Sequence, residues 1–339
     1  MLRRLIPDAF ILMLAGVIAL AWVAPVSAAP AGVVDVVTFL AIFALFFLHG
    51  ARMPREALIA GFADGKLHAA ILSITFGLFP LFGLAMRWVA PDLFDPLLWT
   101  GLLFLCCVPS TVQSSIAYTS MAGGDVAGAV AGAAFSNMAG VFLTPLLASL
   151  LVGTGAAAVS PSGVGRIFML LFIPFMLGHA LRPAMFPLLA KRPGLTFAVD
   201  KGTILLAVYG AFSAATAEGV FSRLPAREVL ALAGMCLLLL ALILASAYLI
   251  GRFGRFSPGS RAAILFCGSV KSLASGAPMA KVLFPPAAAA IVLVPVMTYH
   301  ALQLVVCASI AGGMKRKRSR SAAFVQGAPS SRPERSRRA

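Results

Sequence analysis

Long apolar runs recur along the whole chain, and they constrain its fold more than any other feature. Each is about 20 residues long, the length that a helix needs to cross a bilayer. We expect ten membrane spans, at approximately 9–26, 32–50, 68–89, 97–121, 126–153, 167–181, 196–217, 229–250, 262–284 and 287–312. Helices satisfy their own backbone polar groups in lipid. The sequence therefore predicts an all-α polytopic membrane protein.

The composition agrees with a membrane protein and excludes several other classes. The chain of 339 residues is 60% hydrophobic and 11% charged, whereas soluble proteins carry about 25% charged residues. The net charge of +16 does not indicate nucleic-acid binding, because nine of the 27 Lys and Arg residues follow Met314 and most others lie in short loops. The cysteines and histidines show no metal-ligand spacing, so no metal or disulfide framework is expected.

Basic residues are concentrated in the loops of one side. That side holds Arg3, Arg4, Arg52, Arg55, Lys66, Arg182, Lys191, Arg192, Arg252, Arg255, Arg261 and the tail, whereas the other holds Arg87, Arg166, Arg223, Arg227 and Lys281. By the positive-inside rule, both termini are cytoplasmic and the chain lies in the plasma membrane. The tail, 314–339, is basic and without apolar periodicity, so we expect disorder. A cleavable signal peptide in place of the first span is the alternative, and it would leave nine spans.

The two halves of the chain repeat each other. Spans one to five (1–153) start about 160 residues before spans six to ten (154–313). Five spans per half is an odd number, so the second half must be inverted in the membrane. The hydroxyl-rich stretch 108–115 interrupts span four, and an offset of 162 places it on 270–276 in span nine. Paired interruptions of this kind point to the binding site of a secondary transporter.

Lys271 lies near the middle of span nine, with Ser269, Ser272 and Ser275 around it. An ammonium at bilayer depth costs roughly 3 kcal/mol, so an intramembrane lysine indicates a functional site. Pro278 removes a backbone donor and its ring crowds the carbonyl of Ala274, which predicts that the helix kinks or breaks there.

Several motifs resemble the bile acid:sodium symporter superfamily, and most closely its bacterial, SBF-like subgroup related to the divergent seventh human member. They are Phe47-Leu-His-Gly50, Cys107-Val-Pro-Ser-Thr111, Leu143-Thr-Pro145, Pro174-Phe-Met-Leu-Gly178 and Phe266-Cys-Gly-Ser-Val-Lys-Ser-Leu-Ala-Ser-Gly-Ala-Pro278. The resemblance implies ten helices in a core domain and a panel domain. It also implies that spans four and nine are unwound where they cross, and that substrate binds at the crossing.

The sequence departs from the sodium-coupled members of that superfamily. Ser114 matches a family serine, but the sodium-binding asparagine is replaced by Ser115. Two hydroxyl ligands fall on Ala129 and Ala133, and the shared glutamate falls on Ser269. A neighbouring glutamine falls on Leu273, and a glutamine of the third span on Thr75. A sodium site needs oxygen ligands and an anionic partner, so these replacements argue against two bound sodium ions.

The function predicted is secondary active transport of a small organic anion by alternating access, without a cofactor. Lys271 would stand in for sodium, either as a fixed charge bonded to unwound carbonyls or as a carrier that loads and releases a proton, since desolvation disfavours the charged form of a buried lysine. The candidate site residues are Thr75, Pro109, Ser110, Thr111, Gln113, Ser114, Ser115, Asn137, Ser269, Lys271, Ser272 and Ser275. Ser136, His300 and Gln303 fit interhelical hydrogen bonds better than ligands.

Two other classes of function stay open at this point. A membrane regulator of ion homeostasis would show neither uptake nor counterflow. An intramembrane hydrolase would use Lys271 and Ser275, which stand four residues apart on one helix face, as a Ser-Lys dyad. The sequence does not indicate the substrate, the coupling ion or the oligomeric state.

Overall fold

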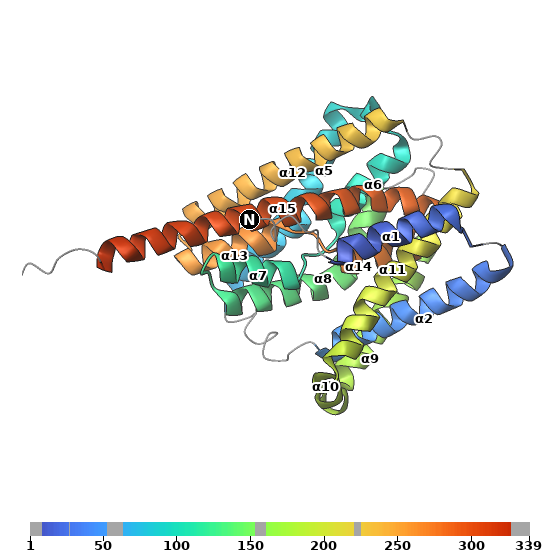
Figure 1. The fold of residues 1–339 in the computed structure, drawn as a ribbon, viewed down its shortest axis with the longest axis horizontal. Coiled ribbons are helices and arrows are strands. Elements are labelled where there is room, and N and C mark those ends of the chain that lie inside the picture. Colours follow the sequence, from blue (N-terminus) through green and yellow to red (C-terminus); the bar gives the residue numbers. More distant parts are fainter. Residues whose placement is uncertain (1–8, 27, 53–63, 153–160, 220–224, 327–339) are drawn as a thin grey trace, which may run out of the picture.

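The computed structural model describes residues 9–26, 28–52, 64–152, 161–219 and 225–326, and all regular structure within these ranges is helical (Figure 1). The first half contains α1 (Ala9–Val23), α2 (Ala28–Arg52), α4 (Gly65–Ser73), the π-helical turn η2 (Ile74–Leu78), α5 (Phe79–Val89), the short 3-10 turn η3 (Pro91–Leu93), α6 (Pro96–Cys107), α7 (Gln113–Met121) and α8 (Val126–Val152). The second half contains α9 (Pro161–Ala180), α10 (Arg182–Ala190), α11 (Pro193–Ala217), α12 (Ala226–Phe253), α13 (Pro258–Ser269), α14 (Leu273–Leu283) and α15 (Pro286–Gln326).

Seven of the described helical segments are long and apolar enough to cross a membrane, or eight if the bent pair α9 and α10 is counted as one span. Two further apolar segments are shorter, 12–23 in α1 and 96–107 in α6. Each expected span coincides with a helix or with an interrupted pair of helices. The all-helical membrane class is therefore confirmed, while length and hydropathy alone do not establish the count of ten.

Two of the expected spans are interrupted within the apolar region. The first break separates α6, which ends at Cys107, from α7, which begins at Gln113. The second separates α13, which ends at Ser269, from α14, which begins at Leu273. Val108 and Val270 each follow the last helical residue in an extended conformation. Irregular backbone at this depth requires partners from protein or water.

The second break lies at residues 270–272, inside the stretch 270–276 where the offset between the two halves placed it. The expectation of a break at Pro278 itself is wrong, because Pro278 lies inside α14. A helix ends where its backbone groups find other partners. The Ser272 hydroxyl accepts a hydrogen bond from the Ser275 N–H (3.1 Å) and so caps the start of α14. The sequence signal of the break is thus the serine cap and not the proline.

A π-helical turn interrupts the third long apolar segment. In η2 the Phe79 N–H donates to the Ile74 carbonyl, five residues back. The carbonyl of Thr75 would take its donor from residue 80 in the same pattern, but Pro80 has no N–H. The turn therefore leaves the Thr75 carbonyl open to a partner from another helix, as π-bulges at functional sites often do.

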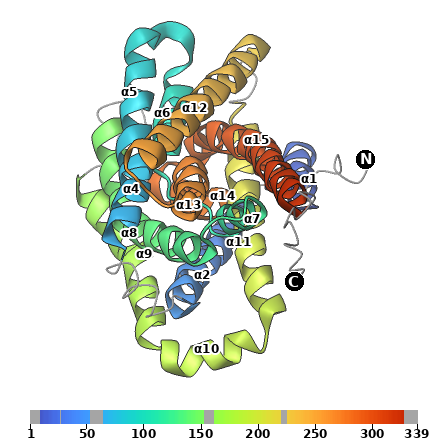
Figure 2. The same cartoon turned by 90° about the vertical axis from the view of Figure 1, so that its left-hand side faces the viewer.

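The helices form two groups. Helices α1, α2, α9 and α11 pack against one another at one side of the molecule. Helix α10 packs on this group through α2, α9 and α11. The remaining helices surround α13 and α14, which lie at the centre when the molecule is viewed end-on (Figure 2). Almost all residues of the 258–283 segment are buried, in contrast to the other long apolar segments. The segment that carries Lys271 is thus shielded by protein.

The last helix is longer than expected. We expected disorder from Met314 onward, but α15 continues to Gln326, so the expectation is wrong for 314–326. Residues 327–339 lie outside the described ranges. Lys, Arg and Ala are good helix formers, and extending an existing helix avoids the cost of nucleation. On this extension Arg318 donates to the carbonyl of Gly123 (2.6 Å).

Candidate functional site

The Lys271 side chain is fully buried, and its ammonium is bonded to three backbone carbonyls. Its Nζ donates to Thr75 O (2.8 Å), Cys106 O (2.9 Å) and Val108 O (2.7 Å). A lysine ammonium has three N–H donors, so all of them are used. Nζ also lies 3.9 Å from the centroid of the Phe79 ring, where the negative face of the ring favours a cation. Carbonyl dipoles and a π-face thus compensate the buried charge.

These three carbonyls are available because two helices are irregular at the same depth. The π-turn leaves Thr75 O without a helical donor. Cys106 O would accept from the N–H of Ser110 in a continuous helix, but that N–H donates to Ser136 Oγ instead (3.1 Å). Val108 lies in the break itself. The lysine therefore binds a cradle of carbonyls that the backbone creates by departing from the α-helix.

Other side chains satisfy the rest of the first break. Thr144 Oγ1 donates to the carbonyl of Cys107 (2.8 Å), and the N–H of Ser272 donates to the carbonyl of Pro109 (2.8 Å). The second of these bonds joins the two breaks directly. These bonds give the buried carbonyls of the break the protein partners that membrane depth requires.

Gln303 of α15 satisfies the second break. Its Oε1 accepts from the Lys271 N–H (2.7 Å), and its Nε2 donates to the Lys271 carbonyl (2.8 Å). The Nδ1 atom of His300 lies 3.3 Å from the same carbonyl, and the Tyr299 hydroxyl donates to the carbonyl of Ser269 (2.8 Å). Gln303 replaces both helical bonds that the Lys271 backbone gives up, so its role is an interhelical bond to main chain.

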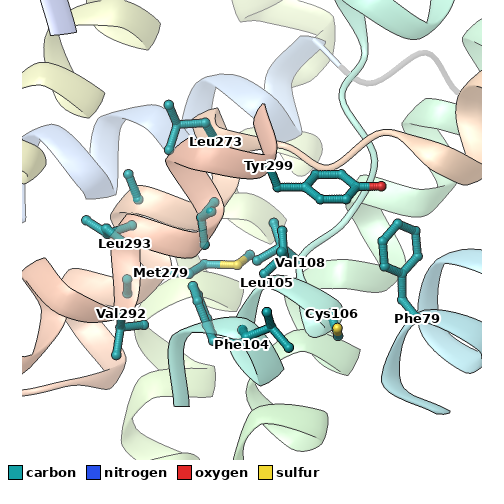
Figure 3. Close-up of a cluster of buried hydrophobic side chains, with 14 of the residues drawn as sticks. Phe79, Phe104, Leu105, Cys106, Val108, Leu273, Met279, Val292, Leu293 and Tyr299 are labelled. Atoms are coloured by element: carbon teal, nitrogen blue, oxygen red, sulfur yellow. The ribbon is translucent and has the colours of Figure 1, made fainter. Parts of the chain in front are cut away.

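Figure 3 shows the apolar surroundings of this cradle, with Tyr299 and Phe79 on one side of Cys106 and Val108. The Phe79 and Tyr299 rings meet edge to face, with centroids 5.8 Å apart. Both side chains are fully buried. The packing fixes Phe79 beneath the ammonium and excludes water from the charge.

Asn137 of α8 bridges the two breaks. Its Nδ2 donates to the carbonyl of Ser110 (2.8 Å), and its Oδ1 accepts from Ser275 Oγ (2.9 Å). Both residues line a small cavity between the two helix groups, with room for about one water molecule (10 Å³). The lining residues are Phe46, His49, Asn137, Val141, Phe175, Ser275 and Met279. The polar bridge thus faces the junction between the groups.

Most of the predicted site residues lie together at the crossing, although several act differently from the prediction. Thr75 contributes its carbonyl to Lys271, while its hydroxyl donates to Ile71 O (2.8 Å) within its own helix. The Ser269 hydroxyl also bonds within its own helix, to Leu265 O. The hydroxyls of Ser110, Thr111, Ser114 and Ser115 bond to one another and to the backbone of the first break. Gln113 is exposed at the start of α7 and does not join this cluster.

The geometry does not form a Ser-Lys dyad. The Lys271 ammonium is directed to carbonyls, and the Ser275 hydroxyl donates to Asn137. A general base would have to accept the serine proton. Within the described residues no group of three or more His, Cys, Asp or Glu side chains could hold a metal ion.

Sequence reasoning missed the groups that hold the lysine. Cys106 and Val108 act through backbone carbonyls, so their side chains gave no signal. One sequence signal was available next to Phe79. Pro80 has no N–H, so it cannot bond Thr75 O in the π-helical pattern, and this indicates a free carbonyl at Thr75.

A protein of apolar helices, two of them interrupted around a buried charge, belongs to the class of multi-pass membrane transport proteins. The model of the SBF-like CPA transporter family matches residues 8–316, so the chain belongs to that family. An uncharacterised Pseudomonas aeruginosa protein is 43% identical over 328 residues, which are 96% of this chain and 98% of that protein. The symporter-named YfeH of Escherichia coli is 41% identical over 83% of this chain and 84% of its own length.

More distant relatives are animal proteins. Sodium/bile acid cotransporter 7 of Danio rerio is 27% identical over 79% of this chain and 81% of that protein. The resemblance to the SBF-like subgroup is confirmed, and the relatives support a transporter of a small solute.

Proposed function

We propose that this chain is a secondary active transporter of a small organic anion that works by alternating access. In this proposal α1, α2, α9, α10 and α11 form a panel domain, and the remaining helices form a core domain around the two breaks. The ten spans make two inverted five-helix repeats, 1–153 and 154–313, with the interrupted pairs α6–α7 and α13–α14 in matching places. Both termini lie in the cytoplasm of a bacterium, on the inner side of the plasma membrane.

The observation that carries the proposal is the position of the Asn137–Ser275 bridge. It joins the two breaks and lines the cavity at the junction of panel and core. Ser275 lies in the first turn of α14, where the helix dipole favours an anion. A carboxylate or sulfonate could accept from the Asn137 amide and the Ser275 hydroxyl after the panel moves away. The small volume of the cavity fits a closed state.

In this mechanism the Lys271 ammonium supplies the positive charge that a bound sodium ion would otherwise supply. Three carbonyl oxygens surround its Nζ, as oxygens would surround a cation. Because all three ammonium donors are engaged, the geometry favours a fixed charge over a proton carrier. Transport by this chain would then require no sodium, whereas the animal relatives are named sodium cotransporters.

The test is uptake and counterflow with purified protein in liposomes, using a panel of organic anions that includes steroid carboxylates, in sodium or potassium buffer at pH 5.5 and 8. Asn137→Ala and Ser275→Ala are each expected to lower uptake at least about tenfold, because a lost hydrogen bond to a charged group is worth about 1.5–3 kcal/mol. Ser149→Ala is the matched control, since Ser149 lies on α8 and bonds only its own helix at Leu146 O.

Two results would contradict the proposal. Transport that requires sodium in the wild type would remove the surrogate role of Lys271. An absence of both uptake and counterflow for every anion, in protein that remains folded, would favour a membrane regulator instead.

A further inference from the structure

A larger cavity, of about 370 Å³, lies between the end of α12, the start of α13 and the part of α15 around Met314. The end of α12 and the start of α13 lie at the left-hand side of Figure 1 beside α15, which continues past them. The lining residues are Tyr248 and Arg252 of α12, Pro258, Arg261, Ala262 and Leu265 of α13, and Met314 of α15. None of them belongs to the cluster around Lys271, so the cavity is a separate feature of the molecule.

The polar part of this cavity is basic. It holds two guanidinium groups and a phenol, and none of its lining residues is acidic. Arg252 Nη1 lies 3.3 Å from the Tyr248 hydroxyl, and Arg261 donates through Nε to the carbonyl of Phe256 (2.9 Å). Across the described ranges the salt bridge found is Arg52–Asp200, so neither cavity arginine is paired with a carboxylate there. Arginine forks bind phosphate with parallel hydrogen bonds.

The backbone between the two arginines is held in place by contacts with Lys66. Lys66 donates to the carbonyl of Gly254 (2.6 Å), and its Nζ lies 4.8 Å from the centroid of the Phe256 ring. The stem of Arg261 packs beside Gly251, where an added Cβ would lie 3.4 Å from Arg261 Cγ, an ordinary van der Waals distance. The connection between α12 and α13 is thus fixed, and the site is formed before any ligand arrives.

The surroundings place the cavity at a membrane surface. Its deeper wall is apolar, with Ala262, Leu265 and Met314. On the outer surface nearby, Leu249 and Phe253 are 48% and 75% exposed, as expected for side chains that meet acyl chains. The exposed basic residues 315–318 follow Met314 directly. Basic pockets between transmembrane helices at such a boundary bind anionic lipid head groups.

We propose that this cavity binds an anionic glycerophospholipid. The phosphate lies between Arg252 and Arg261 with the Tyr248 hydroxyl beside it, and an acyl chain follows the wall of Leu265 and Met314. The inference goes beyond the transport proposal and does not depend on it, because it needs only the membrane setting of the helices.

The experiment is native mass spectrometry of the full-length protein in detergent, titrated with phosphatidylglycerol, with phosphatidylcholine and with inorganic phosphate. Phosphatidylglycerol is expected to bind the wild type tightest. The double variant Arg252→Gln/Arg261→Gln is expected to bind it about tenfold or more weakly, because each basic residue near the surface attracts anionic lipid. The control Arg255→Gln/Arg316→Gln removes the same charge at the same end, outside the cavity lining, and is expected to bind within about twofold of the wild type.

Three results would overturn the proposal: equal binding by the cavity variant, equal weakening by the control, or equal binding of phosphatidylcholine. Inorganic phosphate that displaces the lipid at equal affinity would mean that the site serves a soluble anion. A photoreactive phosphatidylglycerol added to the wild type provides a readout that needs no variant. Its crosslinks should map to the end of α12, the start of α13 and the part of α15 around Met314, and crosslinks only elsewhere would contradict the assignment.

Discussion

Lys271 is held by backbone, and this distinguishes it from most buried charges, which are paired with a carboxylate. The three carbonyls that accept from Nζ belong to residues of the third and fourth apolar segments. The lysine itself belongs to α13–α14, so one side chain joins three segments that are distant in sequence. Removing it would leave three buried acceptors without a donor, each costing about 1–3 kcal/mol.

We therefore expect Lys271→Met to lower the free energy of unfolding by about 3–5 kcal/mol, the range found when one partner of a buried charge is removed. Thermal unfolding of the purified protein in detergent measures this, with Lys191→Met at an exposed position as the control.

A fixed charge also predicts that Lys271→Gln loses uptake equally at pH 5.5 and pH 8. A variant as stable as the wild type, or one whose uptake is restored at one pH, would contradict the fixed-charge role.

At this scale the sequence predicted the charge but not its partners. A lysine in an apolar run is visible, and the serines around it are visible. The acceptors are main-chain oxygens, and they are available only where the helices unwind. The side chains of these residues do not indicate which carbonyls lose their helical donors. Gln303 was noticed as polar, yet its pairing with the Lys271 backbone depends on the position of the break.

At the scale of elements, irregular turns create the site. The π-turn η2 frees Thr75 O only because Phe79 N–H bonds to Ile74 O and Pro80 has no N–H to offer. Replacing an interior proline usually stabilises a helix by about 3 kcal/mol. Here a new N–H at position 80 would compete with the lysine for Thr75 O.

We accordingly expect Pro80→Ala to give no gain in thermal stability and to reduce transport. The comparison is Pro187→Ala, a proline inside the exposed part of α10 that contacts no part of the cradle. A clear rise in the unfolding temperature of Pro80→Ala, with transport intact, would mean that the cradle does not require the π-turn.

Helices α2 and α9 approach each other closely where they cross, and a glycine on each helix allows this. A Cβ on Gly50 would overlap the carbonyl oxygen of Phe175, and one on Gly178 would overlap that of Phe47. Small residues allow this close approach of backbones in membranes. Gly50→Leu is expected to separate the helices and abolish transport or folded yield, whereas Gly16→Leu, with no atom within 4 Å of its Cβ position, is expected to behave as the wild type. Size-exclusion chromatography measures the folded yield of each variant, and uptake measures its transport. Equal behaviour of the two variants would contradict the close approach of α2 and α9 at Gly50.

The elements themselves could be located from the sequence, because each apolar run became a helix or an interrupted pair. The interruption near residues 108–115 was also expected from its hydroxyl-rich sequence. The second break, at residues 270–272, lies inside the stretch 270–276 where the offset between the halves placed it. Only the expected break at Pro278 did not occur, because a proline near the start of a helix is tolerated when the preceding cap is strong, as with Ser272. The extension of α15 was missed because composition describes an isolated segment, not one that continues a formed helix.

For the whole molecule, the proposal requires that the panel move against the core. All five cysteines are buried and free, so the wild type offers a low background for thiol labelling. We expect Met279→Cys, at the cavity between the groups, to react with a membrane-impermeant maleimide at a rate that changes when a transported anion is added. Lys191→Cys, at an exposed position after α10, should react at a rate that the anion does not change. Labelling of Met279→Cys that is insensitive to every transported anion would argue against alternating access at this junction.

The engagement of all three Lys271 donors has an electrical consequence. A sodium ion leaves its site and carries its charge through the membrane, whereas this ammonium is tethered to the polypeptide and returns with it. Each cycle would therefore move the negative charge of the solute without compensation. A negative-inside voltage acts on one such charge with about 2.3 kcal/mol per 100 mV, so an energised cell would drive the solute outward. Under the proposed function, this bonded lysine would therefore suit the chain to expelling anions, whereas a carrier that moves sodium ions together with the anion would be suited to gathering them.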